Sequence, residues 1–504
     1  MSKILGRAGV LVAVGLVASA CSGISVGGLG GIVGSATVAV GVKVSSPSGE
    51  INPSLLGVDG PGAQGAVSSL AQLGLRYDRT DVGFEGTYDG QPVYNCATGA
   101  WNPASLDQRV NMIKAEGSIP ELIIDYTPPC LASVDVPGVN LTYEPPDLGP
   151  NQAKWDALVY QMAYHEISAE GVRVFEVWNE PDGFFWYGGL AGYLHLYNDT
   201  VPVLERAAAA AGATIQVGGP ALAFADPVWI PAFLADVAAN HLPLDFLSWH
   251  YYANDPMVGP GGIIPNPPPG TTPYWYNPLL SARSYGEQVA LVKKFVSAFP
   301  SLHPKLWIDE WNVDAGYDVR MSQTYGAAFA AAVLDSVQSA GLNRMDFFNA
   351  WNSSGGNPPA NWGLLNPNFT PQPVYYTFMF WHEMAGESQL PVSVPDQLLG
   401  REDGRVGAVA SVASNGVVHV LVYNFLAYDL SGNYGTTDPN PFDHQVDLSL
   451  NGLKPGSYTW TQSLVDAQVN GTVVANGSVN AGSASVSFDQ PGESVSLFTF
   501  TPAG

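Results

Sequence analysis

Short apolar runs alternate with amphipathic stretches between residues 51 and 385, and this alternation limits the folds open to the chain. In 152–170 and 287–297 apolar side chains recur at helical intervals. A short apolar run bounded by turn residues is typical of a buried parallel strand. The strand candidates are 55–59, 75–79, 119–125, 172–179, 214–219, 244–250, 305–310 and 345–350. Strands and helices in this order predict an α/β fold, a (β/α)8 TIM barrel over residues 51–385, with a doubly wound open sheet as the rival.

The sequence pattern changes after residue 386 and predicts a second domain. Asn-Gly pairs separate alternating segments at 415–416, 451–452, 470–471 and 476–477. Asn-Gly is a typical hairpin turn, so residues 386–504 are predicted to form an accessory β-sandwich. Valines alternate with small or polar residues within 37–50, which indicates a half-buried strand. Because this strand precedes the barrel, we expect it to join the sandwich.

The amino-terminal residues predict export. Residues 1–21 combine a basic start, a short apolar stretch and the small residues Ala18-Ser19-Ala20 before Cys21, as a secretory signal peptide with a bacterial lipobox does. A lipid on Cys21 would be the membrane anchor, and simple secretion stays open. Residues 22–36 form a Gly-rich tether. We therefore expect an exported protein, either a bacterial cell-surface lipoprotein or a secreted protein.

Composition favours a carbohydrate partner over nucleic acid. The formal net charge is −25, and an acidic surface repels phosphate backbones. The chain has 13 Trp and 23 Tyr, whose rings suit an oligo- or polysaccharide because sugars present flat C–H faces. Most aromatic rings of a folded chain nevertheless lie in its core. Composition predicts no oligomeric state.

Cysteine and histidine spacing gives no support for a catalytic metal or a cofactor. No Cys-x-x-Cys motif occurs, and neither His165-Glu166 nor His382-Glu383 is followed by a second His at metalloprotease spacing. With Cys21 lipidated, Cys96 and Cys130 remain as one disulfide pair in an oxidising compartment. Two separate buried thiols are the alternative.

Two of the predicted strands end on a glutamate. Glu180 closes the run 174–181 at the fourth strand, and Glu310 lies in the run 305–312 at the seventh. The carboxyl ends of the barrel strands meet at one rim, and the active sites of TIM-barrel enzymes lie at that rim. One protonated and one ionised carboxyl group are the minimal apparatus for splitting a glycosidic bond with retention, by double displacement. A buried carboxylate is costly without such a task.

The sequence around these glutamates resembles glycoside hydrolase clan A, and most closely family 39, the β-xylosidases and α-L-iduronidases. The segments that carry the resemblance are Trp178-Asn179-Glu180-Pro181-Asp182 with Phe184-Phe185-Trp186, Val217-Gly218-Gly219-Pro220, 245–252, 305–312, Trp362-Gly363-Leu364-Leu365 and Pro373-Val374-Tyr375-Tyr376. The resemblance implies a retaining O-glycosyl hydrolase with Glu180 as acid/base and Glu310 as nucleophile. A non-catalytic carbohydrate-binding surface lipoprotein is the alternative, and the intact glutamate pair argues against it.

The resemblance also implies sugar-binding neighbours for this pair. Asn179 would bond the hydroxyl next to the reacting carbon, and Arg79 would steady Glu310 by charge. His250 and Tyr252 would line the pocket, with Tyr252 bonding Glu310. Three tryptophans complete the predicted binding residues: Trp351 as a stacking floor, Trp186 beside the acid/base segment, and Trp275 in a long Pro- and Gly-rich loop at 253–283 that we expect to wall the cleft.

One position departs from the family pattern. Family members usually read Arg, a variable residue and then His after the second strand, whereas this chain reads Arg79-Thr80-Asp81. A carboxylate at Asp81 would accept sugar hydroxyls and repel a uronic acid. We therefore expect a neutral pyranoside or arabinofuranoside as the substrate, unless Asp81 points away from the sugar.

Overall fold

The computed structural model describes residues 37–60, 63–85, 91–134, 140–253, 257–259, 262–264, 282–314, 319–352, 361–394, 405–425 and 443–503. The predicted signal peptide, Cys21 and the tether lie outside these residues, as do Trp275 and most of the loop at 253–283. Between residues 254 and 281 of that loop, the structure describes only a small hairpin, β10 (Met257–Gly259) and β11 (Gly262–Ile264). No helix among the described residues has the length and apolar character needed to span a membrane.

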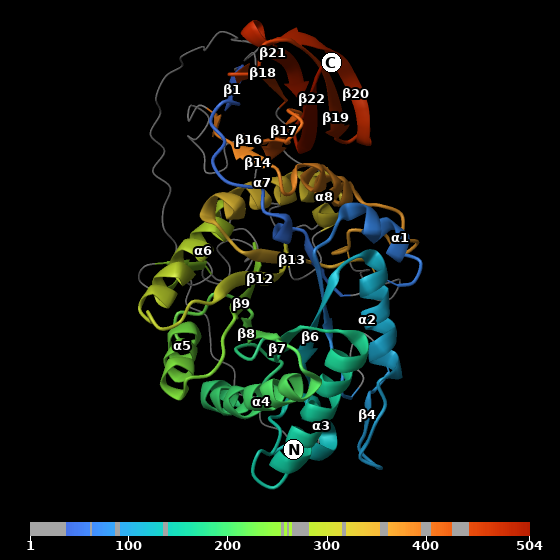
Figure 1. Ribbon diagram of the computed structural model, residues 1–504, viewed down its shortest axis with the longest axis vertical. Coiled ribbons are helices and arrows are strands. Elements are labelled where there is room, and N and C mark those ends of the chain that lie inside the picture. Colours follow the sequence, from blue (N-terminus) through green and yellow to red (C-terminus); the bar gives the residue numbers. More distant parts are fainter. Residues whose placement is uncertain are drawn as a thin grey trace, which may run out of the picture. The chain divides into compact units, whose positions relative to one another are not determined.

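The predicted TIM barrel is confirmed. A closed ring of parallel strands runs in the order β12-β13-β2-β3-β6-β7-β8-β9 (Figure 1). Its strands are β2 (Gly57–Asp59), β3 (Tyr77–Asp81), β6 (Ile119–Ile124), β7 (Val174–Val177), β8 (Gln216–Leu222), β9 (Phe246–Tyr252), β12 (Lys305–Asn312) and β13 (Arg344–Phe348). Each overlaps one of the runs predicted from the sequence, because a strand covered by helices on its outer face and by side chains within must be apolar.

Helices cover the outside of this ring. They are α1 (Val67–Leu70), α2 (Ala104–Glu116), α3 (Gln152–His165), α4 (Gly189–Ala211), α5 (Trp229–Asn240), α6 (Ala282–Ser297), α7 (Thr324–Ala340) and α8 (Pro373–Met384). The predicted helix at 152–170 ends earlier as an α-helix, and Glu166–Glu170 continue it as a π-helical turn, η5. Gly171 ends this turn with a φ of 75°, a left-handed conformation that glycine adopts without strain.

Ion pairs and aromatic rings fill part of the barrel interior. Arg344 pairs with Asp346 at 2.6 Å and with Glu121, and its guanidinium lies over the rings of Tyr77 and Trp307. Trp307 stacks in turn on Phe246, with ring centroids 3.5 Å apart. A buried guanidinium is stable only when paired, so this charged layer specifies which strand ends meet inside the barrel.

The accessory β-sandwich is also confirmed. One sheet has the order β15-β1-β18-β21 and the other the order β14-β16-β17-β22-β19-β20. The strands are β1 (Val38–Lys43), β14 (Ser388–Leu390), β15 (Val392–Ser393), β16 (Arg405–Val412), β17 (Val418–Phe425), β18 (His444–Asn451), β19 (Ser457–Val465), β20 (Asn470–Asn480), β21 (Ser485–Gln490) and β22 (Ser494–Pro502). The valine-rich strand β1 pairs in parallel with β18, and Val38, Val40 and Val42 lie in the sandwich core.

Two predicted turns are wrong. Asn470-Gly471 begins β20, where Asn470 pairs with Val465 of β19. Asn476-Gly477 lies inside β20, where Gly477 pairs with Trp460 of β19. A Cβ atom at Gly477 would lie 2.8 Å from the indole nitrogen of Trp460. The glycine therefore makes room for a ring on the neighbouring strand, a use of glycine in strands that local sequence does not distinguish from a turn.

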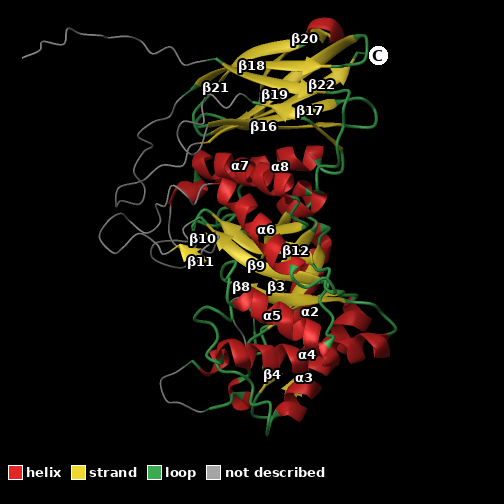
Figure 2. Ribbon diagram, turned by 90° about the vertical axis from the view of Figure 1, so that its left-hand side faces the viewer, coloured by secondary structure: helices red, strands yellow, loops and turns green. Residues whose placement is uncertain are grey.

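Helices α7 and α8 lie between the barrel strands and the sandwich (Figure 2). Phe425 of β17 packs against Tyr325 and Phe329 of α7, and the Tyr423 hydroxyl donates a hydrogen bond to Asp335 Oδ2 at 2.8 Å. The sandwich is thus attached through both aromatic packing and a polar contact.

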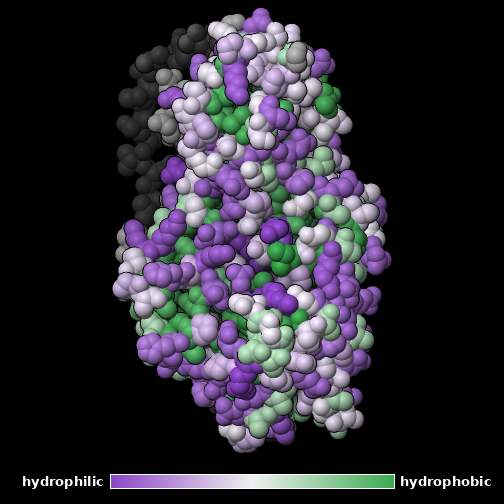
Figure 3. Space-filling view, in the orientation of Figure 1, coloured by the Kyte–Doolittle hydropathy of each residue, from purple (hydrophilic) through white to green (hydrophobic). Residues whose placement is uncertain are grey.

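Hydrophilic side chains, interrupted by smaller hydrophobic patches, cover much of the face shown in Figure 3.

Candidate active site

The segment after β7 brings the Glu180 side chain to the rim of the barrel. Trp178 and Glu180 both have positive φ values, 72° and 45°, which are uncommon for residues other than glycine. The turn is held by a hydrogen bond from the Glu180 N–H to the Ala221 carbonyl at 2.8 Å and by Asp182, whose Oδ1 accepts from the Ala223 N–H at 2.8 Å. Backbone strain of this kind is often found where a side chain must be aimed.

Glu310 approaches the same place from β12. The pairing of β12 with β9 shifts register between Ile308 and Glu310, as at a β-bulge, which changes the direction of the side chain. The Tyr252 hydroxyl donates a hydrogen bond to Glu310 Oε1, as the sequence predicted. Arg79 Nη1 lies 3.5 Å from Glu310 Oε2. Side-chain exposures of 16% for Glu180 and 13% for Glu310 leave both carboxyl groups partly open to solvent.

The two carboxyl groups are close neighbours. One oxygen of each lies, together with a nitrogen of His250, in a group whose atoms are all within 4.8 Å of one another. Retaining glycosidases hold their two carboxyl groups about 5–5.5 Å apart, and inverting enzymes hold them roughly 6.5–9.5 Å apart. An oxygen of one carboxyl group within 4.8 Å of an oxygen of the other fits the shorter spacing, in which one carboxylate attacks the sugar directly.

A buried arginine organises the residues around the pair. Arg79 donates to Asp59 Oδ2 at 2.5 Å, to Glu176 Oε2 at 2.8 Å and to Asn179 Oδ1 at 2.9 Å. The Asn179 amide group in turn donates to the Tyr126 hydroxyl at 3.1 Å. Arg79 therefore fixes the orientation of Asn179 as well as placing a positive charge near Glu310.

Sequence reasoning did not identify three members of this network. Asp59 ends β2, Glu176 lies within β7, and Tyr126 follows β6. A signal was present, since Asp59 and Glu176 are acidic residues inside otherwise apolar strand candidates, and a buried carboxylate requires a partner. The identity of that partner depends on contacts across the barrel, which a linear pattern does not contain.

Burial raises the pKa of both glutamates, but the neighbouring groups that lower it differ between the two residues. Burial raises the pKa of Glu180 to about 7, against a smaller lowering by the Arg79 charge. The pKa of Glu310 is also raised, by burial first and by the Glu180 charge, although His250, Arg79 and the Tyr252 hydroxyl each act to lower it. More groups thus stabilise the anion at Glu310 than at Glu180. These surroundings fit the predicted roles, with Glu180 as the acid and Glu310 as the nucleophile.

His250 bridges the two carboxyl groups. Its Nδ1 lies 2.9 Å from Glu180 Oε1 and 3.4 Å from Glu310 Oε2, and the side chain is fully buried. Burial lowers the pKa of His250 to about 4, so the ring is neutral at pH 7 and can donate one hydrogen bond without adding a charge. Both glutamates and His250 could together ligate a metal ion, but double displacement requires a proton on one carboxyl group and a free oxygen on the other.

Comparison with known proteins identifies the family. Residues 89–457, more than half of the chain, match the model of glycosyl hydrolases family 39. The chain belongs to glycosyl hydrolase family 39. It is therefore a retaining glycosidase that uses two carboxyl groups, and both the predicted family and the predicted enzyme class are confirmed.

Individual family relatives agree with this assignment. A β-xylosidase of Geobacillus stearothermophilus is 27% identical over 368 residues, which are 67% of this chain and 68% of the relative. A β-xylosidase of Caldicellulosiruptor saccharolyticus is 26% identical over 56% of this chain and 57% of its own length. The crystal structure of a monomeric β-xylosidase from Caulobacter crescentus CB15 matches 92% of this chain and 100% of its own, with a TM-score of 0.72 and 20% identity. This last likeness supports the fold alone.

The tryptophans predicted to bind sugar in this family 39 chain have different environments. Trp351 follows β13, is partly exposed and packs against Phe369 with ring centroids 5.4 Å apart. Trp186 is 4% exposed, packs edge-on against Trp178, and donates its indole N–H to the Gly189 carbonyl at 2.9 Å. A ring enclosed in this way offers no open face to a sugar, so the position of Trp186 does not support its predicted sugar-binding role. Trp275 lies outside the described residues.

Asp81 and the cysteines complete the predicted set. Asp81 ends β3 and is 9% exposed, and its backbone carbonyl accepts a hydrogen bond from Arg109 Nη2 at 2.8 Å. Burial and the charge of Asp125, with a smaller contribution from Asp81, raise the pKa of Tyr126. The Cys96–Cys130 disulfide predicted from cysteine counting is present.

Proposed function

We propose that this family 39 glycosidase hydrolyses β-linked neutral sugars, with β-xylosides as its first substrates. The carboxyl groups of Glu180 and Glu310, within 4.8 Å of each other, carry the catalytic part of the proposal. The two β-xylosidase relatives support the sugar, together with an aspartate, Asp81, at the position predicted to meet it.

In the first chemical step, a Glu310 oxygen forms a bond to the anomeric carbon while the bond from that carbon to the leaving oxygen breaks. Glu180 transfers its proton to the leaving oxygen, so the departing alcohol is neutral and Glu180 becomes ionised. Arg79 and the Tyr252 hydroxyl hold Glu310 in place and stabilise its negative charge before attack. Glu310 loses this charge as its oxygen bonds to the anomeric carbon.

In the second step, a water molecule attacks the same carbon and the bond to Glu310 breaks. Glu180 accepts the proton of this water and returns to its starting state, and Glu310 leaves as a carboxylate. One water molecule is consumed for each bond split, and two inversions at the anomeric carbon give net retention. Asn179, oriented by Arg79, would bond the neighbouring sugar hydroxyl in both steps.

Hydrolysis of matched 4-nitrophenyl glycosides tests the proposed substrate. We expect the β-xyloside to have a higher kcat/KM than the β-glucoside, the α-arabinofuranoside and the β-glucuronide. A Glu310→Ala variant, expected to be inactive, controls for contaminating glycosidases. A β-glucuronide turned over faster than the β-xyloside would contradict the neutral-sugar assignment. Failure to turn over any glycoside would favour the non-catalytic sugar-binding alternative.

A further inference from the structure

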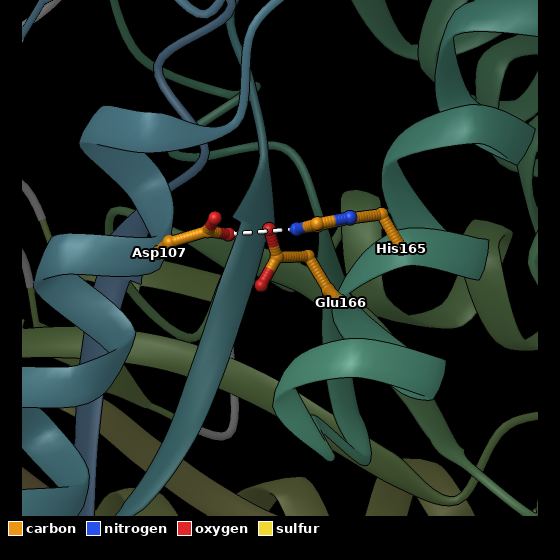
Figure 4. Close-up of side chains that lie close together, drawn as sticks. All are labelled: Asp107, His165 and Glu166. Carbon is orange, nitrogen blue, oxygen red and sulfur yellow. Dashed lines mark hydrogen bonds and ion pairs between the residues drawn. The ribbon is translucent and has the colours of Figure 1, made fainter.

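A second group of ligating side chains lies on the outer helices, away from the catalytic glutamates. Asp107 is in the first turn of α2, His165 is the last residue of α3, and Glu166 begins the π-helical turn η5. Figure 4 shows the Glu166 carboxyl group turned toward the space between the Asp107 carboxylate and the His165 ring. Residues that are 58 positions apart in the sequence thus converge from two neighbouring helices.

The distances within this group are those of a small ion site. Asp107 Oδ1 and His165 Nε2 are 2.8 Å apart, and the three ligating atoms all lie within 4.8 Å of one another. Around a metal ion with bonds of about 2.1 Å, neighbouring ligand atoms lie roughly 3–3.5 Å apart. The 2.8 Å distance lies close to this range, and the upper limit of 4.8 Å keeps the Glu166 oxygen near the other two atoms.

The Glu166 side chain gives an independent sign that a positive group is missing. It is fully buried, and neither of its carboxyl oxygens has a hydrogen-bond partner among the described residues. The neighbouring Lys114 is engaged by Glu170, to whose backbone carbonyl it donates at 3.0 Å. A buried carboxyl group facing a second carboxylate requires either a proton or a cation between them.

The path to solvent is open on the other side of the group. The side chains of Asp107 and His165 are 27% and 30% exposed, so an ion and its water ligands could reach them. The position of the π-helical turn is also notable, because single π turns inside helices occur frequently at functional sites. This turn begins at Glu166, which follows His165 directly, and directs both side chains toward α2.

We propose that Asp107, His165 and Glu166 form a binding site for a divalent transition-metal ion of the Zn²⁺ type, which ties α2 to the end of α3. One imidazole nitrogen and two carboxylate oxygens suit Zn²⁺ or Mn²⁺ better than Ca²⁺, which prefers an all-oxygen shell. The site takes no part in glycoside hydrolysis. Its role is to hold the two helices together in place of the shared proton that would otherwise join the two carboxyl groups.

Calorimetric titration of the chelator-stripped full chain with ZnCl₂ tests the site, with CaCl₂ as a comparison. We expect Zn²⁺ to bind with micromolar or tighter affinity and Ca²⁺ to bind at least ~10-fold more weakly. His165→Ala and Glu166→Gln should each weaken Zn²⁺ binding by ~10-fold or more. Glu166→Gln keeps the shape of the side chain and supplies an N–H donor to Asp107, so this variant remains folded without metal.

Two controls separate this site from other possible zinc ligands. His195→Ala removes a histidine on α4 that lies 3.3 Å from Asp199, and this variant should bind Zn²⁺ as the unmodified protein does. Anomalous diffraction from zinc-soaked crystals should give a peak between Asp107, His165 and Glu166. Unchanged affinity in Glu166→Gln, no binding at concentrations up to about 1 mM, or a zinc peak only at Glu180, His250 and Glu310 would overturn the proposal.

Discussion

At the scale of single residues, two identical side chains at the barrel rim have different surroundings. Burial raises the pKa of Glu180 to about 7, while Glu310 receives a hydrogen bond from Tyr252 and lies near Arg79. The same side chain type can therefore serve as an acid at one strand end and as a nucleophile at another. Substitutions at Glu180 and Tyr252 test these two roles.

The first prediction concerns the proton on Glu180. Because the acid must be protonated to release the leaving group, kcat/KM should fall as the pH rises through about 7. Glu180→Gln should lower kcat by ~10²–10⁴-fold for substrates with poor leaving groups and should abolish the high-pH limb. Steady-state pH profiles measure both effects. A high-pH limb that persists unchanged in Glu180→Gln would assign it to another group.

The second prediction concerns the hydroxyl of Tyr252. Tyr252→Phe removes the donor to Glu310, so the pKa of Glu310 should rise and the low-pH limb of kcat/KM should move to higher pH. A hydrogen bond to a charged group contributes about 1.5–3 kcal/mol, which corresponds to a shift of about 1–2 pH units. Tyr193→Phe is a matched control, since its hydroxyl bonds the Val177 carbonyl. Equal profiles for Tyr252→Phe and the unmodified enzyme would contradict the proposed role.

The third prediction concerns discrimination by charge at Asp81. A carboxylate close to the sugar opposes a second carboxylate by about 1–4 kcal/mol at separations of ~4 Å, in dielectrics between water and a protein surface. The unmodified enzyme should prefer a neutral aryl glycoside to the matched aryl iduronide, and Asp81→Asn and Asp81→His should narrow the difference. If the iduronide is the better substrate of the unmodified enzyme, Asp81 does not face the sugar.

At the scale of elements, the strands were predictable and their inward contacts were not. Runs such as 119–125 and 305–310 are apolar because both faces of a barrel strand are covered, and this signal is local. The pairings of Arg79 with Asp59 and Glu176, and of Arg344 with Glu121, join different strands and leave no mark in either segment. The exposure of the Trp186 side chain was not predictable either, because its aromatic motif has the same sequence whether the ring packs in the core or contacts a sugar.

The fourth prediction concerns the disulfide that ties the segment after β3 to the segment after β6. Cys96 and Cys130 close a loop with a sequence separation of 34. In the chain-entropy model such a bond contributes about 3–4 kcal/mol. The double variant Cys96→Ser, Cys130→Ser should therefore lose about this much free energy of unfolding in denaturant titrations. Reductant should destabilise the unmodified protein and leave the variant unaffected. A variant as stable as the oxidised protein would contradict the expected contribution.

At the scale of the whole molecule, the barrel carries the two glutamates and the sandwich packs against two of its outer helices, α7 and α8. Contacts of Tyr423 and Phe425 with α7 join the two, so the sandwich stabilises the helical layer outside β12 and β13. Glu310 lies on β12, within that supported part of the barrel. The fold could be predicted because strand periods and hairpin turns repeat over long stretches, whereas the convergence of Glu180, His250 and Glu310 depends on closure of the complete ring.

Covalent trapping of the sugar on the enzyme tests directly whether Glu310 is the nucleophile. In a 2-deoxy-2-fluoro-β-xylosyl fluoride the fluorine at C2 slows both chemical steps, and the good fluoride leaving group accelerates only the first. The glycosyl-enzyme should therefore accumulate and the sugar should remain on the protein. Peptide mass spectrometry after digestion should find the fluorosugar on Glu310, with no label in Glu310→Ala. A label on Glu180 or on any other residue, or rapid turnover of the fluoride to product of inverted configuration, would contradict the account.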